Sequence, residues 1–285
     1  MHTLDRVPSK NTPAPTVDRR ILTLEKLSRH SLQQLIDGEV LAIRIPDYCD
    51  ETIAATLNQH IDSSTQLRPY THEVYEEGQV VQHFYGVHRW GTPFNSTYGK
   101  ALEEDARQKY YDDALHMQRL MERLCAPRRT PIQTLIEEFN AHWPTGAAIA
   151  GFEGKPMYAG IIRAMFPETA HLSETTPHVD CLPQAIVPLE QQFSANIYLQ
   201  TPPSGGELRI WDTEPFSFAE IEQFEGENLP QERLLEPLRM VPQKNELIIM
   251  NTRRPHAICG FESGKRISIQ SFIGYVTGQP FQFWC

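Results

Sequence analysis

The chain has 285 residues, of which 40% are hydrophobic and 22% charged, and these proportions are typical of a globular protein that buries a core. Its formal net charge of −10 gives it no electrostatic reason to bind nucleic-acid phosphates, and no apolar run is long enough to predict a membrane span. Five scattered cysteines without a CxxC pair argue for free thiols in a reducing compartment, so we expect a cytoplasmic protein.

The N-terminal half is expected to be mainly helical. Residues 1–20 contain Pro, Lys, Arg and Thr and lack an apolar signal region, so we expect a disordered leader. Residues 21–37 carry apolar side chains at helical spacing and end near Gly38, which predicts a helix. A strand is expected over 40–45, and Asp50 is placed to cap a helix that runs to His60. Residues 63–98 mix strand-like pieces with loop, and 101–124 and 131–142 predict two further helices.

The C-terminal half changes to short β-rich runs separated by turn residues. Strands are expected over 158–166, 192–199, 207–211, 246–251 and 266–275, with turn signals at 202–206 and 263–264. Many short strands between Gly and Pro turns predict a jelly roll or cupin-like barrel. We therefore expect a mainly β fold with α-helices, in which a helical N-terminal part (21–150) flanks a β-barrel core (about 157–275) within one domain spanning 21–285.

The most informative motif is His178-Val179-Asp180, followed far downstream by His256. Two imidazoles and one carboxylate leave half of an octahedral iron open, as in non-haem Fe(II) oxygenases. The triplet alone is weak evidence, because roughly 0.4 such triplets are expected by chance in a chain of this composition. A second one, His60-Ile61-Asp62, falls at the end of a predicted helix, and we interpret it as a solvated surface pair.

The second histidine discriminates between the two triplets. Among the histidines that follow His60, only His256 has an arginine ten residues later, at Arg266. His256 also lies between two predicted apolar strands. His178 and Asp180 are two residues apart, so they share one side of an extended segment. The three candidate metal ligands can therefore converge beside the predicted core strands.

The last predicted strand has one polar face. Arg266, Ser268 and Gln270 alternate with Ile267 and Ile269. A polar face on an interior strand is costly unless a partner satisfies it, and a guanidinium with a hydroxyl suits a carboxylate. The alternative is an exposed edge strand whose polar face meets water.

On these residues the chain resembles the Fe(II)/2-oxoglutarate-dependent oxygenase superfamily, over roughly residues 158–275. The resemblance implies a double-stranded β-helix fold, Fe(II), 2-oxoglutarate as co-substrate and O2. It implies that the keto acid is converted to succinate and CO2 while a C–H bond is oxidised. It assigns iron binding to His178, Asp180 and His256, the 5-carboxylate of 2-oxoglutarate to Arg266 and Ser268, and a co-substrate contact to Asn196.

Departures from related patterns narrow the chemistry that the resemblance implies. Halogenating relatives lack the metal-binding carboxylate, which is present here as Asp180. Nucleic-acid demethylases carry a second arginine six residues after the first, where this chain has Phe272, and collagen-type prolyl hydroxylases use lysine in place of Arg266. We therefore expect a hydroxylase of a small molecule, an amino acid or an amino-acid-derived metabolite, with no nucleic-acid or membrane partner.

Two arginines are candidates for binding a substrate carboxylate. Arg89 lies in a Gly-flanked segment next to Trp90, and Arg163 lies among apolar strand residues, where it needs an anionic partner. The alternatives are that Arg89 is a surface residue packed on Trp90 and that the anionic partner of Arg163 is a structural one. Arg253 and Arg254 lie close to His256 in the sequence, which leaves open both a role in the site and a structural role.

Other functions share these residues. The same iron centre could drive desaturation or ring closure, and a protein-residue hydroxylase would need an open groove instead of a lidded pocket. A non-enzymatic cupin-like metal-binding or ligand-binding module would lack 2-oxoglutarate turnover. The helical N-terminal half is long enough to form a lid and a homodimer surface, which favours a closed pocket and a small substrate.

Overall fold

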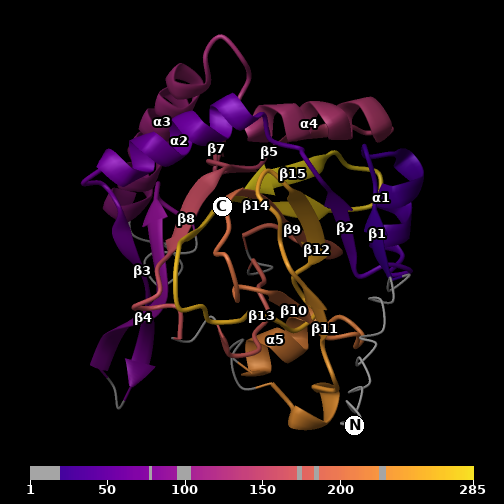
Figure 1. Cartoon of the computed structure of the whole chain (residues 1–285). Helices are drawn as coiled ribbons and strands as arrows, with labels where there is room; N and C mark the ends of the chain where they lie inside the picture. The colour runs from indigo at the N-terminus through magenta and orange to yellow at the C-terminus, as the bar shows by residue number, and fades with distance from the viewer. Residues whose placement is uncertain (1–19, 77–78, 95–103, 172–174, 183–185, 225–228) are drawn as a thin grey trace, which may run out of the picture.

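The computed structural model describes residues 20–76, 79–94, 104–171, 175–182, 186–224 and 229–285. Residues 1–19 of the expected leader and 101–103 of a predicted helix lie outside them. Most of the described β-strands lie in two facing sheets, with helices along one side (Figure 1). The chain thus has the mainly β architecture expected from the spacing of its turns.

The larger sheet has ten strands and contains most of the described β-structure. Its main path runs in the order β1 (Ile21–Thr23), β2 (Ala42–Ile45), β12 (Leu247–Asn251), β9 (Gln191–Gln200), β14 (Arg266–Tyr275), β8 (Ile161–Met165), β4 (Gln79–Trp90) and β3 (Arg68–Glu76). Off this path, β15 (Phe281–Trp284) pairs with β14 and with β5 (Ala147–Ile149). The β1–β2 and β15–β5 pairs are parallel and the others antiparallel, so the sheet is mixed.

The smaller sheet faces the middle of the larger one. It consists of β11 (Leu238–Met240), β10 (Leu208–Ile210) and β13 (His256–Ile258), while β6 (Gly151–Phe152) and β7 (Lys155–Pro156) form a separate two-stranded ribbon. One apolar cluster contains side chains of both facing sheets, among them Ile210, Ile248 and Ile258. The expected double-stranded β-helix is confirmed, but as two facing sheets: among the described strands no pairing closes them into a barrel.

Strands of the larger sheet bury both faces, which explains their continuous apolar runs. In β12, Leu247 and Ile249 pack into the core beneath the helices, whereas Ile248 and Met250 pack between the sheets. Strand β14 lies between β8 and β9 and is buried along almost its whole length. The alternative of an exposed edge strand for residues 266–275 is therefore wrong.

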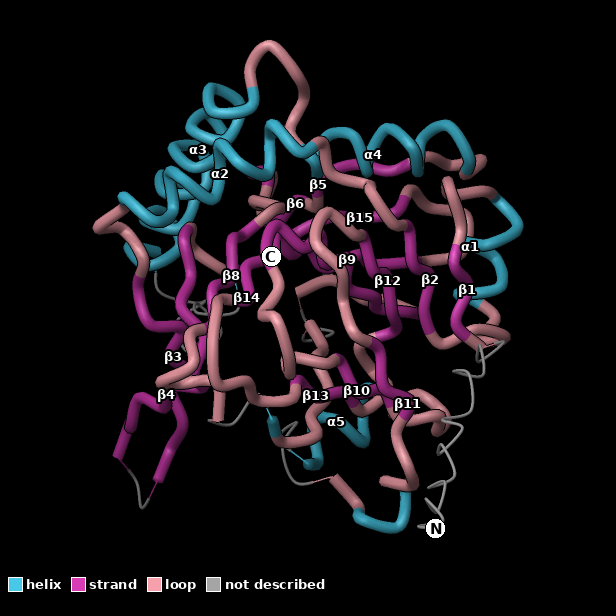
Figure 2. The backbone as a smooth tube through the Cα atoms, viewed as in Figure 1, coloured by secondary structure: helices cyan, strands magenta, loops and turns pink. Residues whose placement is uncertain are grey.

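The helices cover the outer face of the larger sheet. The α-helices are α1 (Arg29–Ile36), α2 (Glu51–Ser63), α3 (Glu104–Cys125), α4 (Pro131–His142) and α5 (Phe218–Phe224), with a 3-10 helix η3 (Gln231–Arg233). Helices α2, α3 and α4 gather on one side of the strands (Figure 2), and α5 lies by the smaller sheet. Asp50 caps α2 as predicted, because its carboxylate accepts hydrogen bonds from the amides of Thr52 (2.8 Å) and Ile53 (3.3 Å). None of the helices in the described part of the chain is long and apolar enough to span a membrane.

The N-terminal part contains more strand than expected. The predicted helix at 21–37 is wrong over nearly half of its length: Ile21–Thr23 is β1, and the helix starts only after Ser28. Ser28 and Ser31 form a reciprocal capping box that fixes this start, while Ile21 and Leu22 pack into opposite cores, as strand residues do. The ambiguous stretch 63–98 contains the hairpin β3–β4, which adds an edge to the larger sheet and places Arg89 in a strand.

Candidate active site

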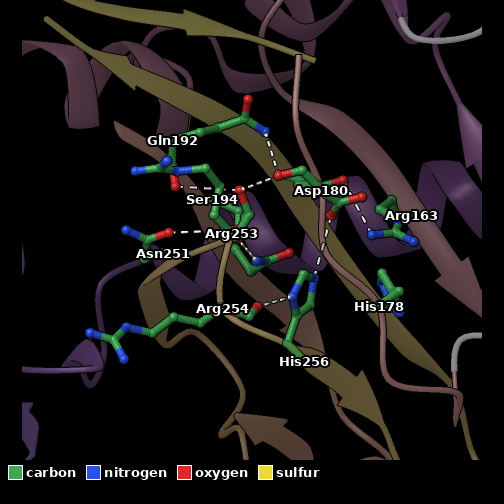
Figure 3. Close-up of polar contacts among 12 residues, drawn as sticks. Arg163, His178, Asp180, Gln192, Ser194, Asn251, Arg253, Arg254 and His256 are labelled. Carbon is green, nitrogen blue, oxygen red and sulfur yellow. Dashed lines mark hydrogen bonds and ion pairs between the residues drawn. The ribbon is translucent and has the colours of Figure 1, made fainter. Parts of the chain in front are cut away.

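The two parts of the predicted metal-binding set meet through backbone hydrogen bonds. His178 and His256 form an antiparallel bridge in which the amide of each donates to the carbonyl of the other, at 3.0 and 2.9 Å. Two residues further on, the Asp180 amide donates to the Thr252 carbonyl at 2.9 Å. The segment that carries His178 and Asp180 is thus held against the connection between β12 and β13 (Figure 3).

The side chains of Thr252 and Gln192 also hold the segment that carries His178 and Asp180. The Thr252 hydroxyl and the Gln192 amide both donate to the Asp180 carbonyl, at 3.0 and 3.3 Å. The Gln192 side-chain carbonyl accepts from the Leu182 amide at 2.7 Å. Gln192 is almost fully buried, so these bonds are shielded from water. The sequence analysis missed both anchors, because their role depends on a contact between distant segments.

The three predicted ligands form one compact group. One donor atom from each of His178, Asp180 and His256 lies within 4.8 Å of the other two. His256 Nε2 and Asp180 Oδ2 are 3.4 Å apart, and the two imidazole centroids are 4.5 Å apart. Ligand atoms on adjacent sites of an octahedral ion lie about 3 Å from one another, so small side-chain adjustments would allow one ion to contact all three.

Hydrogen bonds fix the protonation pattern of both imidazoles. His178 Nδ1 lies 2.9 Å from the Thr176 carbonyl, and His256 Nδ1 lies 3.0 Å from the Arg254 carbonyl. A carbonyl oxygen can only accept, so each Nδ1 carries a proton and Nε2 is the nitrogen that could bind a metal; without a metal, His256 Nε2 donates to Asp180. This is how metal-binding histidines are usually oriented.

Asp180 is held in its ionised form. Burial alone would raise the pKa of this carboxyl, but the hydrogen bond from His256 and the charges of His256, His178 and Arg163 outweigh burial and hold it well below its usual range. Its side chain keeps 33% of its exposure, whereas that of His256 keeps 8%. Asp180 is therefore an anionic ligand on the accessible side of a partly buried cluster.

Arg266 and Ser268 share the polar face of β14, and each has a buried polar atom without a hydrogen-bond partner. Arg266 is 5% exposed, and its Nη2 donates to the Tyr198 hydroxyl at 3.0 Å, but its Nε has no hydrogen-bond partner. The Ser268 hydroxyl is also buried without a partner. A buried donor left unsatisfied costs about 1–3 kcal/mol, so this pair fits an anionic ligand that would accept from both.

The neighbouring strand β9 supplies two more polar groups to the same side of the larger sheet. Tyr198 lies opposite Ser268 in the β14–β9 register, and the Arg266 guanidinium carbon lies 4.9 Å from its ring centroid. Asn196 is two residues away on the same face, opposite Gln270, and donates to the Ser194 hydroxyl at 3.2 Å. Tyr198 was missed by the sequence analysis, although its two-residue spacing from Asn196 could have indicated it.

The two arginines proposed for the substrate lie side by side on adjacent strands. Arg89 of β4 and Arg163 of β8 are register partners, and Arg163 in turn lies opposite Ser268. Arg163 reaches the metal-binding cluster, where its charge lowers the pKa of Asp180 (Figure 3). Arg89 instead donates to the Gly91 carbonyl at 2.6 Å, which ties it to the end of its own strand.

The two arginines before His256 hold the surrounding loops. Arg253 donates to the carbonyls of Glu190 (2.8 Å) and Phe216 (3.3 Å), and Arg254 hydrogen-bonds the Thr213 carbonyl and lies 3.7 Å from the Asp212 carboxylate. Both guanidiniums are buried and point away from the three-ligand cluster (Figure 3). These contacts give both residues a structural role.

Comparison with known proteins agrees with this geometry. The family model described as the 2OG-Fe(II) oxygenase superfamily matches residues 165–274, the part that contains all three candidate ligands and Arg266. No curated protein sequence matches the chain. Over residues 165–274 the chain therefore matches the 2OG-Fe(II) oxygenase superfamily, and the three candidate ligands form a site that suits Fe(II).

Solved structures share the fold over most of the chain. A Burkholderia ambifaria AMMD protein described as an N-substituted L-amino acid dioxygenase aligns with a TM-score of 0.58 at 12% identity, covering 90% of this chain and 91% of that one. The same protein in complex with alpha-KG aligns with a TM-score of 0.54 at the same identity and coverage. A Pseudomonas putida prolyl-4-hydroxylase aligns less well, with a TM-score of 0.44 at 13% identity over 86% of this chain and 99% of that one. At 12% identity the likeness to the two B. ambifaria structures establishes the fold alone.

Proposed function

We propose that His178, Asp180 and His256 hold the iron, that Arg266 and Ser268 hold the distal carboxylate of 2-oxoglutarate, and that the enzyme hydroxylates an unactivated C–H bond of a small molecule, an amino acid or an amino-acid-derived metabolite. The main support for the proposal is that Arg266 Nε and Ser268 Oγ on β14 are both buried without a hydrogen-bond partner. Ser268 lies opposite Arg163, which is next to the three-ligand cluster. A dicarboxylate that reaches from the cluster to Arg266 would satisfy both.

In this proposal some residues bind the iron and 2-oxoglutarate, and others orient the residues that bind them. Bound iron with 2-oxoglutarate supplies the oxidising chemistry, in which the keto acid becomes succinate and CO2. The carbonyls of Thr176 and Arg254 orient the two imidazoles, and Thr252 and Gln192 fix the segment of Asp180. Arg266 and Tyr198 are buried, so the substrate is expected on the more exposed side of the site, next to Asp180.

The proposal is tested by anaerobic visible spectroscopy of the purified protein with Fe(II), before and after 2-oxoglutarate is added. We expect a weak charge-transfer band only when both are present, and its loss in His178→Ala. The matched control is His171→Ala, an exposed histidine seven residues earlier. Wild-type protein that binds iron but shows no band with 2-oxoglutarate would favour the metal-binding module.

Turnover then defines the reaction. Succinate release is screened with amino acids and their N-substituted derivatives, the class on which the fold-related B. ambifaria enzyme is described as acting. The mass of the product separates the outcomes, because hydroxylation adds one oxygen whereas desaturation and ring closure remove two hydrogens. Succinate release stimulated only by peptides or proteins would overturn the small-molecule substrate.

A further inference from the structure

A second cavity, separate from the candidate active site, lies on the helix side of the larger sheet. Helices α3 and α4 cover this side (Figure 1), and together with β5 and the segment before β8 they line a cavity of about 190 Å³. Its floor includes Ile269 of β14, which packs in the core beneath the helices. Ser268 and Gln270, on either side of Ile269, belong to the opposite face of the strand. The sheet therefore separates this cavity from the candidate metal ligands.

The inner part of the cavity is apolar. Met121, Ile132, Met157 and Tyr158 line it and are all buried. The Tyr158 hydroxyl donates to the Gly160 carbonyl at 2.9 Å, so it offers the cavity no free polar group. An apolar cavity of roughly 150 Å³ accepts benzene, so this one has room for an aromatic ring and about two further atoms. The thioethers of the two methionines are favourable neighbours for such a ring.

The mouth of the cavity has one charged group. Among the described residues that line it, Glu122 is the one with a charge, and it is half-buried. Its Oε1 accepts hydrogen bonds from Gln133 Nε2 at 3.0 Å and from Gln118 Nε2 at 3.2 Å. Within the described part of the chain no lysine or arginine forms an ion pair with Glu122. Two amides therefore hold the carboxylate in place, and its Oε2 is available to a ligand.

From the apolar interior and the anionic mouth we infer that this cavity binds a small arylalkyl amine. The aromatic ring would lie between the methionines, and a protonated amine on a short arm would donate to Glu122. A cation gains more from a carboxylate than a neutral donor does, and a ligand with a carboxylate of its own would be repelled. The inference goes beyond the proposed function and does not rest on it, because the cavity lies on the other side of β14.

The test is a titration of the full chain, labelled with ¹³C in its methionine methyl groups, and benzylamine is the probe. Benzyl alcohol and benzoate, of nearly the same shape, are the neutral and anionic comparisons. We expect saturable shifts of the methyl signals of Met121 and Met157, and none for Met240 and Met250, which pack between the two sheets. Substitutions of single methionines by leucine, which nearly conserve volume, assign the signals. Benzylamine is expected to bind about threefold to fivefold more tightly than benzyl alcohol, as a partly exposed ion pair allows, and benzoate more weakly than both.

Variants assign the binding to the cavity and the preference to its carboxylate. Glu122→Gln is expected to remove the preference for the amine and to keep the binding of benzyl alcohol. Glu39→Gln, an exposed residue in the turn after α1, makes the same change in net charge and should leave the preference unchanged. Ile149→Trp, at an exposed position of the lining, is expected to cover the mouth and abolish the binding of both ligands. Val241→Trp, also exposed but outside the cavity, is its matched control.

Each outcome supports or overturns one part of the inference. Loss of the amine preference in Glu122→Gln, with shifts confined to Met121 and Met157, would support it. The absence of saturable shifts at these two methionines in the wild type would overturn the site, whatever the variants do. Equal affinities for amine and alcohol in the wild type, or a preference that survives in Glu122→Gln, would overturn the amine as the ligand. The titration needs neither iron nor 2-oxoglutarate, so its failure is distinguishable from a failure of the proposed function.

Discussion

The chain contains two His-x-Asp triplets, and the structure gives them different surroundings. His60 and Asp62 lie in the last turns of α2, where residues two apart point to different sides of the helix. The His60 ring stacks on Trp90 with centroids 4.9 Å apart, and Asp62 pairs with Lys265 at the surface. The interpretation of this triplet as a surface pair is supported by these contacts, because both side chains have ordinary partners.

The second triplet differs in backbone conformation and in its neighbours. His178 and Asp180 lie in an extended segment, so both side chains point towards His256. The backbone groups of Thr252 and His256 that hold the segment come from residues more than 70 positions away in the sequence. The comparison teaches that the spacing of two ligands means little until the backbone conformation and the source of the third ligand are known.

The largest effect is expected when the carboxylate of the second triplet, Asp180, is replaced and the same change is made in the first. Asp180→Asn removes the anionic ligand with almost no change in shape, and we expect kcat/KM to fall on the order of 1000-fold, because the metal supplies several kcal/mol of the stabilisation. Asp62→Asn, the same change in the other triplet, is expected to leave activity within a factor of two. Succinate release and Mn(II) affinity measure both. Similar losses in the two variants would contradict the assignment of the metal site.

The second-largest effect is expected when Arg266, on the polar face of β14, is replaced. Arg266→Gln is expected to raise the KM for 2-oxoglutarate roughly 100-fold, because removing one partner of a buried charged pair costs about 2–5 kcal/mol. Arg266→Lys keeps the charge but loses the fork, so a smaller rise is expected. Titration of 2-oxoglutarate at saturating iron gives both values. An unchanged KM in Arg266→Gln would show that the buried Nε serves another partner.

The structure brings the predicted metal ligands together, whereas several strand pairings around them were not predicted. The polar alternation of 266–270 and the ten-residue spacing from His256 are local patterns, and both fall on a strand whose bounds agree with the prediction. Tyr198 and Gln192 were missed because their roles arise from pairing between β9 and distant segments. The β1 strand was missed for the same reason: three residues gain strand structure only by pairing with β2.

A smaller effect is expected at Gln192, which holds the site without touching the metal. Gln192→Leu removes both the bond to the Asp180 carbonyl and the acceptor for the Leu182 amide. We expect Mn(II) affinity to fall about tenfold, as is common when outer partners of metal ligands are lost. Gln192→Glu keeps an acceptor for Leu182 and should lose less. Thermal unfolding of the apo-protein separates this effect from a general loss of stability.

The smallest effect is expected for Lys265, the ion-pair partner of Asp62 in the first triplet. Lys265 lies directly before Arg266, yet its ammonium pairs with Asp62 at the surface, where the two side chains keep 34% and 51% of their exposure. Because exposed ion pairs contribute little, Lys265→Ala should lower the free energy of unfolding by less than about 1 kcal/mol. It should also leave the KM for 2-oxoglutarate within a factor of two, although the substitution is adjacent to the proposed carboxylate-binding residue. Urea unfolding and co-substrate titration measure the two quantities. A large rise in KM would mean that the ion pair to α2 helps to position β14, and the two triplets would then not be independent.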